Sequence, residues 1–286
     1  MVASKWPVTI VTCFYKIPGN TKRSLKQYRD WMANFFEIRT PKVIFTDRET
    51  YRDFFTSRTA GNVRYVFVDW QKFLCWGLYD KFVESADDEA KWRLNMLWNE
   101  KIHFVRRAIG LNLYGSEFFV WTDIGCFRDS RYNRFYRSWP SIRRLRSIGA
   151  AKVTLLLISP FEDKHKHAQA DGLPPSVGQQ AEAPGTVGAG IMSGHSKAWL
   201  RWHDRYYKTL MRSVDAGRLL GSDQPFLSAT YLLYPQLANL VAIRHSPFCL
   251  NPWFYLQPYL QGLPAPRLTF WEQYRGTGLK AWQVGN

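Results

Sequence analysis

Asp123 is the side chain of this sequence whose setting best suits chemistry. It follows a short run of large apolar and aromatic residues, which predicts a buried strand over residues 117–123, and Gly125 comes shortly after it. Ligands of open α/β sheets bind beyond the carboxyl ends of the strands, so a carboxylate here could contact a metal ion or a sugar. The alternative is that Asp123 only opens a turn, because Asp and Gly are common turn residues.

Two later segments also suit contact with a ligand. Gly188, Ala189 and Gly190 let a backbone approach a ligand or another strand closely. Gly194 lies one residue too far along for the Gly-x-Gly-x-x-Gly fingerprint, and the segment does not follow the first strand, so a Rossmann dinucleotide site is not indicated. Asp223 precedes a helical stretch, where it could cap the helix or contact a substrate.

The densest basic run of the chain follows Asp123. Arg128, Arg131, Arg134 and Arg137 recur every third residue with aromatic residues between them, which predicts one side of a helical turn. Such a run is often a solvated helix surface. It could also bind an anion, such as a phosphate-bearing acceptor, a lipid head group or a diphosphate.

The histidines and cysteines give little support for a metal site. His165 and His167 lie in a polar loop, and a lone histidine such as His245 is more often packed or hydrogen-bonded than a ligand. The four cysteines, Cys13, Cys75, Cys126 and Cys249, are far apart and form no Cys-x-x-Cys pair. This spacing argues against zinc and against a disulfide scaffold, and it favours reduced thiols in a cytosolic setting.

The apolar periodicity predicts alternating strands and helices. The expected strands are 8–15, 42–47, 62–69, 117–123, 152–159 and 240–244, and the expected helices are about 21–36, 51–59, 89–109, 196–213 and 226–234. Strands joined by helices imply parallel βαβ units, so we expect a single α/β domain over residues 1–286, with a mixed, mostly parallel sheet flanked by helices. The polar segment 161–186 is expected to be a flexible loop that could act as a lid.

Composition constrains the partners. Lys and Arg number 39 against 23 Asp and Glu, so the formal charge of +16 predicts an anionic partner. An acidic membrane surface, a phosphorylated substrate and nucleic acid all qualify, but no nucleic-acid-binding motif accompanies the charge. Neither a secretory signal nor a membrane-length apolar stretch is evident, which favours a cytoplasmic protein that could lie on the inner face of a membrane. The tail, 262–286, mixes aromatic and cationic residues as interfacial anchors do.

The order of these parts resembles a GT-A type glycosyltransferase, which is Rossmann-like, and more narrowly the HtrL/YibB family of bacterial envelope-associated proteins. The segments that carry the resemblance are 9–15, 42–47, 98–101, 119–125, 187–192 and 222–224. Together they span about residues 8–256. Each motif is short, so their order carries more weight than any one of them.

The resemblance implies that a nucleotide-sugar donor binds near Thr12, Phe14 and Tyr15. Asp123 would stand where GT-A enzymes carry an Asp-x-Asp motif, whose carboxylates hold Mn²⁺ or Mg²⁺ against the donor diphosphate. Here the second Asp is replaced by Gly125.

Other residues must therefore complete the diphosphate site. Asp129 and His245 are candidates for completing a metal site with Asp123. Alternatively, Lys101 and Arg128 could neutralise the diphosphate without a metal. We favour a metal, because Asp123 would otherwise place like charges together.

The resemblance also places the segment Gly188–Gly190 beneath the donor sugar, and Asp223 and Gln224 near the anomeric carbon as catalytic residues. This favours a retaining transferase, although in an inverting enzyme Asp223 would be the general base. The expected acceptor is an anionic envelope glycan or glycolipid, such as a lipopolysaccharide core or a capsule. The alternative is a non-catalytic GT-A-like module that binds an acidic membrane surface or nucleic acid.

Overall fold

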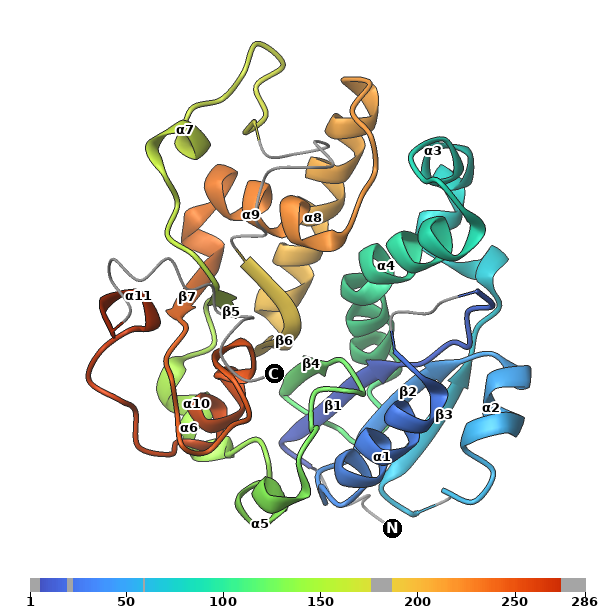
Figure 1. Cartoon of the computed structure of the whole chain (residues 1–286), viewed down its shortest axis with the longest axis vertical. Helices are drawn as coiled ribbons and strands as arrows, with labels where there is room; N and C mark the ends of the chain where they lie inside the picture. The colour runs from blue at the N-terminus through green and yellow to red at the C-terminus, as the bar shows by residue number, and fades with distance from the viewer. Residues whose placement is uncertain (1–5, 20–22, 59, 176–186, 274–286) are drawn as a thin grey trace.

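The fold is built on one seven-stranded sheet, seen in a computed structural model that describes residues 6–19, 23–58, 60–175 and 187–273 (Figure 1). The strand order is β3-β2-β1-β4-β6-β5-β7. The strands are β1 (Val8–Cys13), β2 (Lys42–Thr46), β3 (Val63–Phe67), β4 (Phe118–Thr122), β5 (Val153–Leu157), β6 (Val187–His195) and β7 (Ala238–Ala242). All neighbouring pairs are parallel except those of β6, which is antiparallel to both β4 and β5. The predicted mixed, mostly parallel α/β sheet is confirmed.

Helices cover both faces of the sheet (Figure 1). The longer ones are α1 (Leu25–Phe36), α4 (Glu89–Leu111), α8 (Ser196–Asp215) and α9 (Asp223–Leu233). The shorter ones are α2 (Arg48–Phe54), α3 (Tyr79–Glu84), α5 (Asn133–Tyr136), α6 (Ile142–Ile148), α7 (Asp163–Lys166), α10 (Leu256–Gln261) and α11 (Phe270–Gln273). Five 3₁₀ turns complete the described elements: η1 (Trp70–Lys72), η2 (Leu74–Leu78), η3 (Ser130–Tyr132), η4 (Pro235–Leu237) and η5 (Pro252–Phe254).

The core lies in two layers, one on each face of the sheet. Along β1, Val11 and Cys13 pack with residues of α4, α8 and α9, whereas Val8 and Ile10 pack with residues of α1, α6 and α10. This division follows from the two-residue period of a strand. Every residue of β1 is buried, as expected of an interior strand covered by helices on both faces.

Two local predictions about helices are wrong. The long helix was expected over residues 89–109, ending at Gly110, but α4 runs on through Gly110 to Leu111 and ends at Asn112, whose φ of 33° lies in the left-handed region. The arginines from Arg128 to Arg137 do not share one helix. Arg128 lies in a loop, Arg131 belongs to η3 and Arg134 to α5.

Some expectations concern segments that lie partly outside the described residues. Of the loop 161–186, residues up to 175 are described and include α7, and residues 176–186 lie outside. Of the tail 262–286, residues up to 273 are described and include α11. All four cysteines are buried and free. Within the described ranges, no helix combines the length and apolar character needed to cross a membrane.

Candidate functional site

A cavity opens where β1 and β4 end, at the edge of the sheet where open α/β proteins bind ligands. It encloses about 170 Å³. Its polar and charged lining comes from Lys16, Arg23, Lys101, Asp123 and Arg128. The aromatic lining comes from Phe14, Tyr15, Tyr28, Trp31, Trp98, Trp253 and Phe254. Cations beside aromatic rings suit a ligand that carries both negative charge and flat apolar surfaces.

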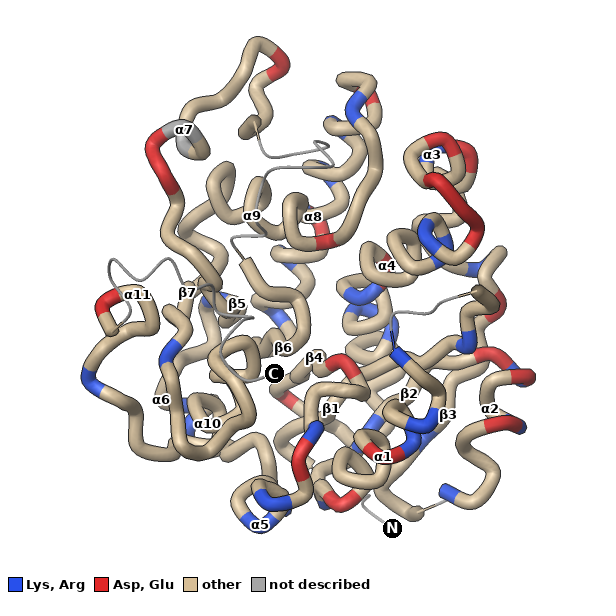
Figure 2. Tube along the Cα trace, in the orientation of Figure 1, with Lys and Arg blue, Asp and Glu red and all other residues tan. Residues whose placement is uncertain are grey.

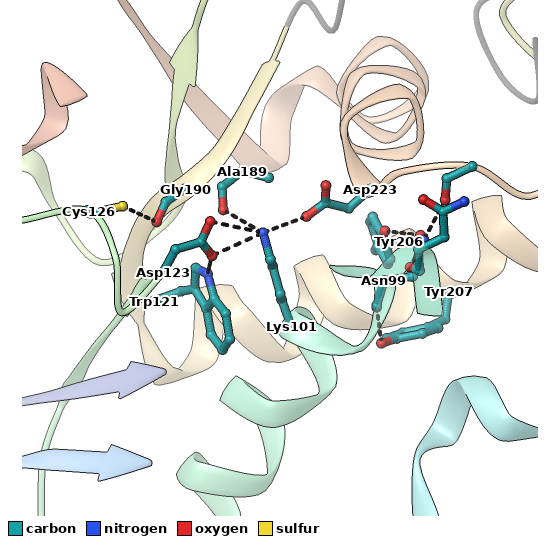
Figure 3. Close-up of polar contacts among 12 residues, drawn as sticks. Asn99, Lys101, Trp121, Asp123, Cys126, Ala189, Gly190, Tyr206, Tyr207 and Asp223 are labelled. Atoms are coloured by element: carbon teal, nitrogen blue, oxygen red, sulfur yellow. Dashed lines mark hydrogen bonds and ion pairs between the residues drawn. The ribbon is translucent and has the colours of Figure 1, made fainter. Parts of the chain in front are cut away.

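The ammonium group of Lys101 stands between two carboxylates at the base of this cavity (Figure 3). Its Nζ lies 3.1 Å from Oδ1 of Asp123 and 3.1 Å from Oδ2 of Asp223. It also donates to the backbone carbonyl of Ala189 at 3.4 Å. The three contacts come from the residue after β4, from α9 and from β6, so Lys101 links these three elements at the cavity.

The two carboxylates keep Lys101 charged although it is buried. Burial opposes the charged form, but Asp123 and then Asp223 outweigh that effect, so the pKa of Lys101 is raised above its ordinary value. Burial raises the pKa of Asp223, and the neighbouring ammonium opposes that rise. Removing Lys101 would leave two carboxylates close together with no counter-charge.

Accessibility separates the two carboxylates. The side chain of Asp123 is 41% exposed, whereas those of Lys101 and Asp223 are only 5% and 6% exposed. Asp123 is held in place because the indole Nε1 of Trp121 donates to its Oδ1 at 3.0 Å and its backbone N–H donates to the carbonyl of Gly190 at 2.8 Å. A ligand in the cavity can therefore reach Asp123, while Asp223 lies behind Lys101 and is not part of the lining.

Asn99 supports this arrangement from two residues before Lys101 on α4 and had no predicted role. Its Nδ2 donates to the carbonyl of Gly221 at 2.9 Å, which ties α4 to the segment just before Asp223. Its Oδ1 accepts from the hydroxyl of Tyr206 at 2.7 Å, and its carbonyl accepts from Tyr207 at 2.8 Å (Figure 3). The signal that could have identified Asn99 is its burial near a buried lysine on the same helix. That burial is known only from the fold, so the sequence alone did not show it.

Most of the predicted site residues meet at the cavity. Those in its lining are Phe14, Tyr15, Lys101, Asp123, Gly125, Arg128 and Gly190, and Ala189 contributes its carbonyl through Lys101. The aromatic side chains of Tyr28, Trp31 and Trp253 also line it and were not predicted as site residues. They come from α1 and η5, which only the tertiary structure brings to the ends of β1 and β4.

Five predicted residues do not reach the cavity. Thr12 is fully buried inside β1, and a Cβ on Gly188 would meet Ile158 and Leu156, so both positions serve packing within the fold. The remaining three are Asp223, Gln224 and His245. Asp223 and Gln224 form the start of α9, and His245 is exposed after β7. A ligand in this cavity would therefore not touch Asp223 or Gln224. Asp223 acts on the cavity only through its ion pair with Lys101.

Gly125 has no room for the carboxylate that an Asp-x-Asp motif would place there. A Cβ at Gly125 would lie 2.9 Å from Cε3 of Trp31 and 3.3 Å from the Tyr28 ring. The guanidinium of Arg128 packs over the Trp31 ring at 4.4 Å, and its Nε donates to the carbonyl of Gly125 at 3.1 Å. A side chain added at Gly125 would therefore meet Trp31, which is itself covered by the stacked Arg128.

The residues present do not fit a divalent cation at Asp123. Asp129, one proposed partner, binds Arg131 through its carboxylate at 2.6 Å, and His245 lies outside the cavity lining. Across the described part of the chain, no three His, Cys, Asp or Glu side chains gather in a group that could hold a metal ion. The position between the two carboxylates is taken by the Lys101 ammonium.

The fold and the site define the class of this protein. It is an α/β protein with a mixed, mostly parallel sheet and a cationic, aromatic-lined cavity at the carboxyl ends of its first and fourth strands. Comparison with protein-family models and with curated protein sequences finds no match to the chain.

Proposed function

We propose that this chain is a glycosyltransferase that moves a sugar from a nucleotide-sugar donor to an anionic glycan or glycolipid acceptor. The resemblance to GT-A enzymes motivates this proposal. The observation that carries it is Lys101, held between Asp123 and Asp223 at the base of a cavity that Arg128 and several aromatic rings also line. A nucleotide sugar offers the matching groups, since it carries a diphosphate together with a flat base and a sugar ring.

In the proposed reaction, cationic side chains hold the diphosphate. Lys101 and Arg128 supply positive charge where negative charge develops on the leaving nucleotide, which favours the transition state over the bound donor. Asp223 positions Lys101 and keeps it protonated. Asp123 is the carboxylate that a substrate can touch, which makes it the candidate to interact with the reacting sugar or its acceptor.

The size of the cavity limits what it encloses. Its 170 Å³ is below the roughly 300–1,000 Å³ typical of small-molecule sites, so it would hold the diphosphate and a ring, with the rest of the donor extending outside. The acceptor then approaches from the open side. The charge of +16 favours a phosphorylated or acidic acceptor and contact with an anionic membrane surface where a glycolipid would lie.

A thermal-shift screen of nucleotide sugars, each with and without added Mn²⁺, tests this function. We expect one nucleotide class to raise the unfolding temperature, and we expect chelation with EDTA to leave that shift unchanged. Hydrolysis or transfer of the sugar from the stabilising donor would then be followed directly. Absence of stabilisation by every nucleotide sugar in both conditions would contradict the proposal.

Substitution of Lys101 tests the site itself. Lys101→Met should remove donor binding, whereas Lys81→Met, at a lysine paired with Glu84 outside the cavity, should not. Lys101→Met also leaves two carboxylates without their cation, a change that costs about 3–5 kcal/mol of stability in comparable buried pairs. The double variant Lys101→Met/Asp223→Asn removes that repulsion and keeps the binding test valid if the single variant fails to fold.

The non-catalytic alternative makes a different prediction. The residues that would bind the anionic surface are the exposed arginines Arg131, Arg134 and Arg137, which lie outside the cavity. If the chain served only to dock on DNA or an acidic membrane, binding to these would fall steeply with salt and would not change in Lys101→Met/Asp223→Asn.

A further inference from the structure

A second cavity, of about 900 Å³, lies between α6, β7 and the chain around α10. Figure 1 shows α6 and α10 side by side on the β7 side of the molecule. Its lining includes Arg143, Arg144 and Arg244 together with the rings of Tyr255 and Tyr259, and no Asp or Glu of the described residues contributes to it. It is separate from the first cavity, since no residue lines both.

Two of these arginines are fixed by groups that do not neutralise them. The guanidinium of Arg144 lies 4.2 Å from the ring centre of Tyr259, and its Nε donates to the Tyr259 carbonyl at 3.2 Å. Arg244 donates from Nη1 to the carbonyls of Pro266 at 2.7 Å and Arg267 at 2.6 Å. A guanidinium has five N–H donors, so each keeps others for a ligand. Fixing the side chains beforehand lowers the entropy cost of binding.

Among the described residues, the arginines of this cavity lack a counter-charge, unlike several cations elsewhere on the surface. Lys16 pairs with Asp53, Arg106 with Asp204 and Arg146 with Glu117. For Arg143, Arg144 and Arg244, the described part of the chain supplies no carboxylate partner. Three like charges around one hollow produce a concentrated positive field, which an incoming anion neutralises.

Figure 2 shows that charge is unevenly spread over the chain, with acidic segments gathered at α3 and the start of α4, and basic ones at α5. The second cavity lies away from the acidic region, which includes Asp87, Asp88 and Glu89. An anionic ligand approaching α6 would therefore meet cations without passing that acidic surface.

We infer that this second cavity binds a saccharide that carries a phosphate or carboxylate group. Guanidinium groups match the flat, paired oxygens of both anions. The half-buried ring of Tyr259 supplies an apolar face for a sugar ring beside the buried Tyr255, and the volume of about 900 Å³ holds far more than a lone ion. The inference does not require that the chain transfers sugar.

Isothermal titration with glucose 6-phosphate and with glucuronate tests the inference, using glucose and inorganic phosphate as comparison ligands. We expect saturable binding of at least one acidic sugar, with weaker binding of glucose and of phosphate alone. The double variant Arg143→Gln/Arg144→Gln should weaken the binding at least about tenfold, the usual effect of losing charge-assisted hydrogen bonds. Arg146→Gln, on the same helix but outside the cavity, should bind as the unmodified chain does.

Three results would overturn the inference. The first is that neither acidic sugar binds at millimolar concentration. The second is that Arg143→Gln/Arg144→Gln binds the sugar as tightly as Arg146→Gln does. The third is that inorganic phosphate binds as tightly as the sugars. The double variant could unfold because Arg144 packs on Tyr259. In that case Arg143→Gln alone replaces it as the test variant, since Arg143 is exposed. Vesicles containing anionic phospholipid form a further arm: binding to them without binding to the soluble sugars would assign the cavity to lipid head groups instead.

Binding here should also be independent of the first cavity. Lys101→Met/Asp223→Asn should leave acidic-sugar binding unchanged while removing nucleotide-sugar binding. Loss of both together would assign the acidic sugar to the first cavity and contradict a second site, whereas failure of nucleotide-sugar binding alone would leave the second cavity intact.

Discussion

Lys101 illustrates how a buried charge depends on its partners. An isolated ammonium group would lose its proton on burial, but two carboxylates at 3.1 Å favour the charged form. Such an arrangement contributes little net stability compared with apolar side chains of the same size, because desolvating Lys101 and Asp223 is costly. Its persistence in a cavity at the ends of the strands is therefore better explained by a ligand than by folding.

Replacement of Gly125 tests the explanation for the missing second carboxylate. Gly125→Asp should destabilise the protein by about 1–3 kcal/mol through overpacking against Trp31, and it should not create Mn²⁺ binding. Denaturant unfolding and calorimetry measure the two effects. Gly61→Asp is the matched control, because no atom lies within 4 Å of a Cβ at Gly61. Mn²⁺ binding by a stable Gly125→Asp variant would refute the steric argument.

The lowered pKa of Lys42 predicts how the stability of the folded protein changes with pH. Burial lowers its pKa from 10.5 to about 7, and its ammonium donates to the carbonyls of Ile38 and Thr40. Between these two values the unfolded chain holds a proton that the folded chain has released. Stability from this group is therefore smallest below pH 7 and rises towards pH 10.5, by at most about 1.4 kcal/mol per pH unit.

The difference between the unmodified chain and Lys42→Met isolates this effect from the tyrosines and cysteines that titrate at high pH. Urea unfolding at several pH values from 7 to 10 should show the unmodified chain gaining stability relative to the variant. A constant difference across that range would mean that Lys42 keeps an ordinary pKa in the folded protein.

At the scale of elements, the antiparallel strand β6 holds the two central residues of the site, because its carbonyls accept hydrogen bonds from Lys101 and from the backbone of Asp123. It lies between β4 and β5 and runs against both, so its carbonyls at Ala189 and Gly190 meet the end of β4. A Cβ at Gly190 would lie 3.5 Å from the sulfur of Cys126 and 3.8 Å from Oδ2 of Asp123, which are ordinary contact distances. The backbone carbonyls of this segment, rather than the absence of side chains, therefore hold Asp123 and Lys101 at the base of the cavity.

The end of α4 provides a prediction about helix capping. Gly110 lies inside the helix with nothing within 4 Å of its added Cβ, so Gly110→Ala should stabilise the protein by about 0.5–1 kcal/mol through helix propensity. Gly149→Ala, also in open space but at a φ of 98°, should destabilise it because of backbone strain alone. Chemical denaturation measures both. Destabilisation by Gly110→Ala would show that this glycine ends the helix after all.

At the scale of the whole molecule, the charge of +16 predicts a response to salt. Like charges repel in the folded state, and raising NaCl from about 0.01 to about 0.1 M shortens the screening length from roughly 30 to 10 Å. The unfolding temperature should therefore rise over this range in a buffer without binding anions. A fall would indicate that favourable pairs such as Lys16 with Asp53 outweigh the repulsion.

Local sequence patterns predicted six of the seven strands and the four longer helices in their order, but not β6, whose glycine-rich segment was expected only to lie close to a ligand or another strand. The β-branched and aromatic runs at residues 8–13 and 118–122 became β1 and β4 because side-chain alternation and burial are encoded over a few residues. The same is true of Asp123, whose place at the end of a strand follows from that run alone. Boundaries were less certain, as Gly110 shows, because an asparagine can also adopt the left-handed conformation that ends a helix.

The site depended on contacts that no local pattern contains. The resemblance assigned Lys101, Asp123 and Asp223 to one donor site, but only the packing of α4 and α9 around the ends of β4 and β6 sets the lysine between the two carboxylates. The same packing places Trp31 against Gly125 and sets Asp223 behind the lysine. Residue types are determined by the sequence, whereas the free volume and counter-charge around each one are determined by neighbours from distant segments.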